Sequence, residues 1–110
     1  MIEIKAGIDL DRAIAGVIGL ICTQRVLGSD IEFYADPRAG TLAVPRTFKP
    51  STNLNDAFDA AEAAGMFLEL QRLSSGWMAS THAMKGKCAN GETAALAICA
   101  AILLLKSLEA

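Results

Sequence analysis

The residue types that carry most catalytic and metal chemistry are scarce in this chain. Its 110 residues include one histidine and three cysteines. His82 is best interpreted as a half-buried strand residue, although Cys88 is near enough in the sequence for a Cys–His pair across a turn. Because Cys22, Cys88 and Cys99 lack the short paired spacings of zinc motifs, we expect free thiols in a reducing cytoplasm. We predict no catalytic residue, no cofactor and no metal.

Neither sign of charge is in excess, and no apolar run is long. Ten basic and twelve acidic residues give a net charge of −2 and a pI near 5.3, which makes nucleic acid an unlikely partner. The longest apolar run covers residues 94–105, whereas a membrane-spanning helix needs about 20 residues. The first residues show no signal-peptide pattern. We therefore expect a soluble, cytoplasmic protein without a membrane partner.

What the chain does have is alanine. Hydrophobic residues make up 53% of the sequence, and twenty residues are alanine. Alanine buries little area but allows helices to approach closely. The length fits a single domain over residues 1–110, and we expect it to have a modest core helped by self-association.

Hydrophobic residues at helical spacing predict the first two helices. Asp9 precedes a stripe that runs to Ile21, in a helical region ended by Gly28, and residues 1–8 form a short strand or a loose arm. The second helix follows the polar residues 51–53 and ends at Gly65. Its core side is predicted to be Leu54, Ala57, Phe58 and Ala61, with Asp56, Asp59 and Glu62 facing water.

Alternating patterns predict two hairpins. The first pairs residues 30–34 with 41–44 across a turn at 36–40, and the second pairs 66–73 with 77–84. A polar loop over 85–92 leads to a last helix over 93–108. The prediction is an α+β fold in which a small antiparallel sheet of about four strands is packed by three helices, in the order α-β-β-α-β-β-α.

The last helix is apolar on every side, so one contact face cannot bury it. It either passes through the centre of the fold or meets its own copy in a dimer. The candidate residues for such an oligomer interface are Leu96, Ile98, Ile102 and Leu105.

A few basic residues are candidates for contacts with an anionic ligand. The loop over 86–93 resembles a phosphate-binding loop only superficially, because its Gly and Lys order is wrong. Solvated surface charge is the simpler interpretation of the basic residues. The candidates are Arg38, Arg46, Lys49, Lys85 and Lys87.

Several of these segments together resemble a known family. They are the Pro-Ser-Thr run at 50–52 before an alanine-rich helix carrying Phe58, the hairpin containing Gly76-Trp77, and the helix that starts Thr93-Ala94-Ala95-Leu96. The chain resembles the small phage and prophage proteins of the phage ABA sandwich domain, and is similar in layout to NinX-type phage proteins. The resemblance implies a sheet sandwiched by helices and a phage setting, and it brings no catalytic residues.

Two functions compete at this stage. The first is a non-enzymatic interaction protein of a phage or prophage, acting in the host cytoplasm as a homodimer or larger homo-oligomer. The second is a ligand-binding protein that sequesters a nucleotide during anti-phage defence, with its pocket at a subunit interface. The partners that we expect are therefore the chain itself, a host protein or a small anionic ligand.

Overall fold

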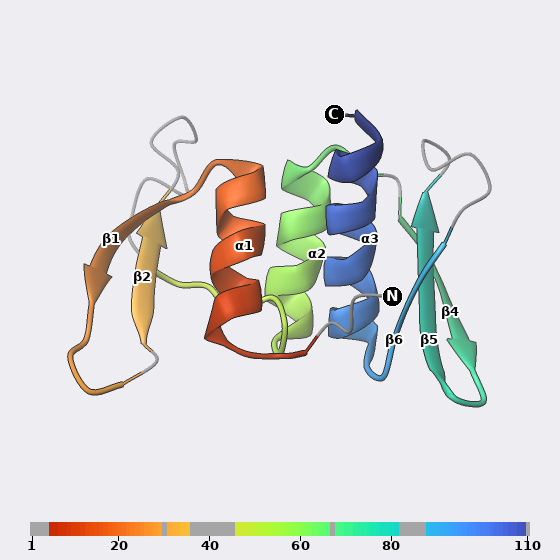
Figure 1. The fold of residues 1–110 in the computed structure, drawn as a ribbon, viewed down its shortest axis with the longest axis horizontal. Helices are drawn as coiled ribbons and strands as arrows, with labels where there is room; N and C mark the ends of the chain where they lie inside the picture. The colour runs from red at the N-terminus through yellow and green to blue at the C-terminus, as the bar shows by residue number, and fades with distance from the viewer. Residues whose placement is uncertain (1–4, 30, 36–45, 67, 82–87, 110) are drawn as a thin grey trace.

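The fold has a layer of three helices with a small sheet on each side. It is described here from a computed structural model, which covers residues 5–109 except 30, 36–45, 67 and 82–87. The elements follow the order α1, β1, β2, β3, α2, β4, β5, β6, α3. Strands β1–β3 form sheet A beside α1, and β4–β6 form sheet B beside α3 (Figure 1). The α+β prediction is confirmed, but the single four-stranded sheet is wrong, since two three-stranded sheets are present.

Helix α1 (Ile8–Ile18) is shorter than its hydrophobic stripe predicts. Gly19 takes a left-handed conformation at φ 85° and donates its N–H to Ala15 and Gly16, which ends the helix. The chain continues as strand β1 (Ile21–Arg25), where a helical turn had been predicted. The start of the helix also differs, since Gly7 rather than Asp9 is the N-cap residue.

Sheet A is antiparallel, with β2 (Glu32–Ala35) between β1 and the short β3 (Arg46–Thr47). Strands β1 and β2 form a hairpin closed by a turn, in which Ser29 donates its N–H to the Val26 carbonyl. Gly28 has φ 77° there, a conformation that side chains disfavour. The predicted turn at 36–40 and strand at 41–44 lie outside the described residues.

Helix α2 (Leu54–Ala63) has the ends that the sequence predicts. The Asn53 side chain accepts a hydrogen bond from the Asp56 N–H, and Gly65 follows the helix at φ 77°. The side of the helix that faces the core differs from the predicted one. Leu54 and Phe58 are exposed, whereas Asp56 is buried with the alanines at 57, 60 and 61.

Sheet B is built from β4 (Leu68–Leu73), β5 (Gly76–Thr81) and β6 (Ala89–Gly91), paired antiparallel in that order. The second hairpin is therefore confirmed over its described part. Strand β6 lies in the segment predicted as a polar loop. Three residues are too few to show an alternating pattern, so the sequence had no means of revealing this strand.

Helix α3 (Ala94–Glu109) is the centre of the core. It packs against α2, α1 and sheet B, and the side chains of Ala97, Ile98, Cys99, Ala101 and Ile102 have no exposed surface. Burying each isoleucine contributes about 1.5–3 kcal/mol to folding. Of the two predicted placements for this helix, the structure has the central one.

The contact between β6 and α3 is too close for a side chain at Gly91. A Cβ atom there would clash with the Ala97 nitrogen and lie 2.9 Å from the Leu96 Cβ. Overpacking of this kind costs about 1–3 kcal/mol. We predict that Gly91→Ala lowers the free energy of unfolding by that amount in urea titrations.

Gly16→Ala is the matched control, because the exposed Gly16 lies within α1 with no atom near its added Cβ. It is expected to stabilise the protein by about 0.5–1 kcal/mol. Equal unfolding free energies for the two variants would contradict the close packing of β6 on α3.

Candidate functional site

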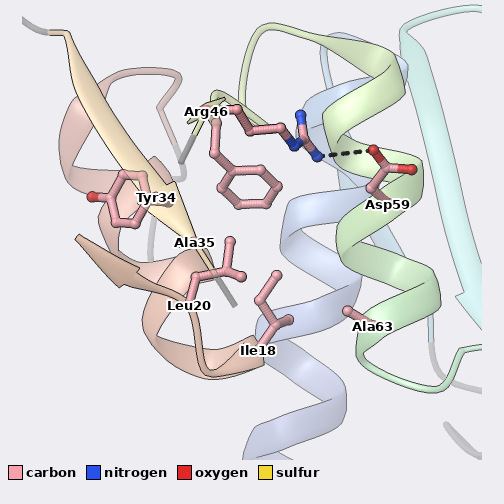
Figure 2. Close-up of a pocket in the computed structure, with 8 residues that line it drawn as sticks. Ile18, Leu20, Tyr34, Ala35, Arg46, Asp59 and Ala63 are labelled. Atoms are coloured by element: carbon pink, nitrogen blue, oxygen red, sulfur yellow. Dashed lines mark hydrogen bonds and ion pairs between the residues drawn. The ribbon is translucent and has the colours of Figure 1, made fainter. Parts of the chain in front are cut away.

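A small pocket lies between sheet A and the C-terminal ends of α1 and α2 (Figure 2). Its cavity volume is about 20 Å³, room for one water molecule. Pockets for small-molecule ligands are typically about 300–1,000 Å³. The pocket is therefore a packing gap rather than a binding site. Its walls are Ile18, Leu20, Tyr34, Ala35, Phe48 and Ala63, with Arg46 and Asp59 across its edge.

Arg46 joins sheet A to α2 through two carboxylates. Its guanidinium lies 2.8 Å from Asp56 Oδ1 and 3.1 Å from Asp59 Oδ2, and it also stacks 5.8 Å above the Phe48 ring. The other Asp56 oxygen accepts the Lys49 N–H at 2.9 Å. Arg46 was predicted to contact an anion. The two carboxylates already neutralise its positive charge.

The remaining predicted anion contacts do not form a described site. Arg38, Lys85 and Lys87 lie outside the described residues. Lys49 lies just before α2 and is half-buried. The described residues therefore bring together only Arg46 and Lys49, and Arg46 is paired with acids.

Glu32 is the centre of a second polar cluster, which joins sheet A to α1. Its carboxylate is buried and accepts hydrogen bonds from Arg12 Nε at 2.8 Å and the Tyr34 hydroxyl at 3.0 Å. Arg25 Nε lies 2.6 Å from its other oxygen. Asp9 lies 3.8 Å from Arg12, so two arginines and two carboxylates leave the cluster without net charge.

The contacts within this cluster shift the pKa values of Glu32, Arg12 and Tyr34. The hydrogen bond from Arg12 lowers the pKa of Glu32, against the opposing effect of burial, and raises that of Arg12. Burial, followed by the hydrogen bond to Glu32, raises the pKa of Tyr34 to about 12. Tyr34 therefore stays protonated at neutral pH and serves as a donor.

The thiols do not form a site among the described residues. Cys22 is half-buried with Sγ 3.9 Å from Glu32 Oε2, and Cys88 is exposed. Burial raises the pKa of Cys99 to about 12, so it carries almost no thiolate at neutral pH. Across the described part of the chain, no three His, Cys, Asp or Glu side chains are grouped to hold a metal. His82 lies outside the described residues.

A larger hollow lies where α2 and α3 begin, and its volume is about 350 Å³. Its walls come from Ala6, Ser51, Thr52 and Leu54 on one side and from residues 93–96 on the other. The Ser51 hydroxyl is held by the Gly7 backbone at 3.1 Å, and the Thr93 hydroxyl caps α3. Leu54 and Leu96 are its largest apolar side chains.

Large apolar side chains are exposed on two described surfaces. One is the β1–β2 hairpin, where Leu27 in the turn is 97% exposed. The hairpin surface comprises Ile21, Val26, Leu27 and Ile31. The other is the outward side of α2, which carries Leu54 and Phe58. Sequence reasoning missed both surfaces, although two apolar residues directly before Gly28-Ser29 are the signal that marks an apolar turn.

The four residues predicted as an oligomer interface are buried inside the single chain. Leu96 is 8% exposed, Leu105 is 3% exposed, and the two isoleucines are fully buried. Helix α2 and sheet B cover them, because α3 lies between these elements. In the single chain this surface of α3 belongs to the core.

Comparisons with family models, curated proteins and solved structures found no match to this chain. Among the described residues, no helix is long and apolar enough to cross a membrane.

Asp56 and Asp59 hold the same arginine but differ in burial. The Asp56 side chain is 10% exposed and that of Asp59 is 53% exposed. Asp56→Ala leaves the Lys49 N–H without a partner and Arg46 with Asp59 alone, which costs about 1–3 kcal/mol. Asp59→Ala is expected to cost less than about 1 kcal/mol. Urea unfolding of the two variants measures the difference, and equal losses would contradict it.

Glu32 makes stability depend on pH in a defined direction. Its folded pKa lies below the ordinary 4.5, so its contribution is complete above pH 4.5 and is lost as the pH falls through the folded value. We predict that Glu32→Gln unfolds more easily at pH 7 and loses less stability than the wild type between pH 5 and 3. Glu62→Gln, at an exposed position, is the control. Parallel pH profiles for Glu32→Gln and the wild type would contradict the prediction.

Proposed function

We propose that this chain is a non-enzymatic interaction protein that associates with itself through the β1–β2 hairpin. The observation that supports this most directly is the exposure of four large apolar side chains on one hairpin, with Leu27 97% exposed in its turn. Apolar surface gathered in one place is typical of protein interaction sites. A lone exposed leucine would need no explanation, but Val26 and Ile31, which are hydrogen-bonded to each other at the same turn, are exposed with it.

The rigid attachment of sheet A to the helices favours this use of the hairpin. Glu32 in β2 is bonded to Arg12 in α1, and Arg46 in β3 is bonded to Asp56 in α2. A hairpin held at both sides of its sheet can present its turn to a partner without losing much conformational freedom. This supports a binding role for a surface that contributes little to the core.

The sequence supports the other two parts of the proposal, which are the setting of the protein and its lack of enzymatic activity. A phage or prophage origin rests on the resemblance to phage ABA sandwich proteins, and the host cytoplasm rests on the three cysteines without paired spacings. The non-enzymatic assignment rests on the single histidine and the lack of a recognisable motif.

Ligand binding is the second candidate function, and the 350 Å³ hollow at the start of α2 and α3 favours it. A ligand that binds only the folded protein raises its melting temperature. Nucleotides at millimolar concentration that leave the melting temperature unchanged would remove this candidate.

Light scattering on a size-exclusion column, over a concentration series, tests self-association. The monomer mass is 11.6 kDa, and we predict that the measured mass rises toward twice that value with concentration. Leu27→Ser is expected to weaken association at least about tenfold, because burying a leucine contributes about 1.5–3 kcal/mol.

Gln71→Ser, at an exposed position of β4 in sheet B, is the control and is expected to associate as the wild type does. A wild type that stays at 11.6 kDa throughout the series would refute the self-association.

A further inference from the structure

The apolar turn of the β1–β2 hairpin has few contacts of its own to fix its direction. Leu27 is 97% exposed, so packing against the fold does little to hold it. The Val26 N–H donates to the Ile31 carbonyl at 3.0 Å, and the Ser29 N–H donates to the Val26 carbonyl at 3.3 Å. The contacts that set the turn relative to the helices therefore lie in the strands at its base.

Arg25 and Glu32 are the cross-strand pair at the base of the turn. They lie directly opposite each other, next to Val26 and Ile31, and Arg25 Nε is 2.6 Å from Glu32 Oε2. Strand β1 is the edge of sheet A, and a bulge interrupts its pairing with β2. Its residues are exposed except for the half-buried Cys22. This strand therefore gains little from the core, and the contact with Glu32 is what holds it beside the turn.

Glu32 continues this contact to α1. Arg12 meets the carboxylate with two nitrogens, since its Nε lies 2.8 Å from Oε1 and its Nη2 lies 3.3 Å from Oε2. Paired contacts of this kind fix the relative orientation of the two groups as well as their distance. The side chains of Arg12, Glu32 and Arg25 thus form a continuous connection from the helix layer to the base of the turn.

The connection depends on one buried carboxylate. The charged and titratable side chains that face it in the described part of the chain are Arg12 with its neighbour Asp9, Arg25, Cys22 and Tyr34. Glu32 is 5% exposed, whereas the Arg12 and Arg25 side chains are 42% and 63% exposed. Without the carboxylate both guanidinium groups return to water, and the base of the turn loses its link to α1. The buried carboxylate itself offers almost no surface to a second copy.

We propose that Glu32 is the positioning residue of the hairpin surface, and that it fixes the apolar turn on α1 in the direction that self-association requires. This inference rests on the proposed self-association and adds the residue that controls its strength. A turn that has the binding direction for only a fraction of the time lowers the apparent affinity by that fraction, and in a dimer both copies contribute the loss. Glu32 therefore strengthens association without touching the partner copy.

Light scattering of Glu32→Gln and Arg12→Met tests this role. Each variant removes one side of the same contact, and each is expected to weaken self-association about fivefold or more. Because the two side chains act through each other, the double variant is expected to lose no more than the stronger single variant. Wild-type association in both single variants, or losses that add in the double variant, would overturn the positioning role.

Gly91→Ala is the matched control for a general loss of stability. It strains the contact of β6 with α3 and leaves the hairpin unchanged. It is expected to associate as the wild type does. An equal loss of association in Gly91→Ala and Glu32→Gln would reduce the effect of Glu32 to stability alone and refute the inference.

Amide exchange in the monomer measures the connection without self-association. At low protein concentration, the Val26 and Ser29 amides are expected to exchange at least about tenfold faster in Arg12→Met than in the wild type, although Arg12 lies in α1. Gly91→Ala is expected to leave both amides unchanged, because the turn opens locally. Unchanged exchange in Arg12→Met contradicts the connection.

Leu27→Ser separates this inference from the proposed function. If Leu27→Ser weakens association and the Glu32 and Arg12 variants do not, the hairpin surface stands and its positioning by Glu32 is refuted. If Leu27→Ser has no effect, or the wild type stays monomeric, the proposed function fails and the inference fails with it.

Discussion

The complete burial of α3 is the constraint on which the rest of the structure depends. The helix has no polar side to place in water, and five of its side chains have no exposed surface. One neighbouring element cannot cover a helix on all sides, so sheet B and the other two helices surround it. Its small residues make this possible, since they allow neighbouring elements to approach closely, as β6 does at Ala97. Gly91 is required in β6 for the same reason.

Sheet A is attached in a different way. Sheet B contributes to the apolar surface around α3. Sheet A contributes Tyr34 to the same core and is also joined to α1 and α2 by the ion pairs of Glu32 and Arg46. Buried ion pairs position elements well but add little net stability, because the charges lose their hydration. The apolar residues of its hairpin are thus left outside the core, and there they are available to a partner.

The sequence predicted the elements that have long, regular patterns and missed those decided by single residues. The last helix, the second hairpin and both ends of α2 were predicted correctly, because periodicity and capping residues are local signals. The end of α1 depends on Gly19 in a left-handed conformation, and hydrophobic spacing alone carried the predicted helix to Ile21. The rotation of α2 depends on Arg46 and Lys49, which draw Asp56 inward and turn Phe58 outward. That contact lies ten residues apart in the sequence, so no local pattern revealed it. The apolar outward side of α2 was missed for the same reason, whereas the apolar turn had a local signal in the two residues before Gly28.

Hydrogen exchange at low and high protein concentration tests the central claim, that α3 belongs to the core of one chain while association uses other surfaces. The account predicts that amides of residues 95–105 exchange most slowly at both concentrations. Residues of the β1–β2 hairpin are predicted to gain protection only at high concentration. Protection of residues 95–105 that appears only at high concentration would contradict the account, because it would place α3 in an interface between copies.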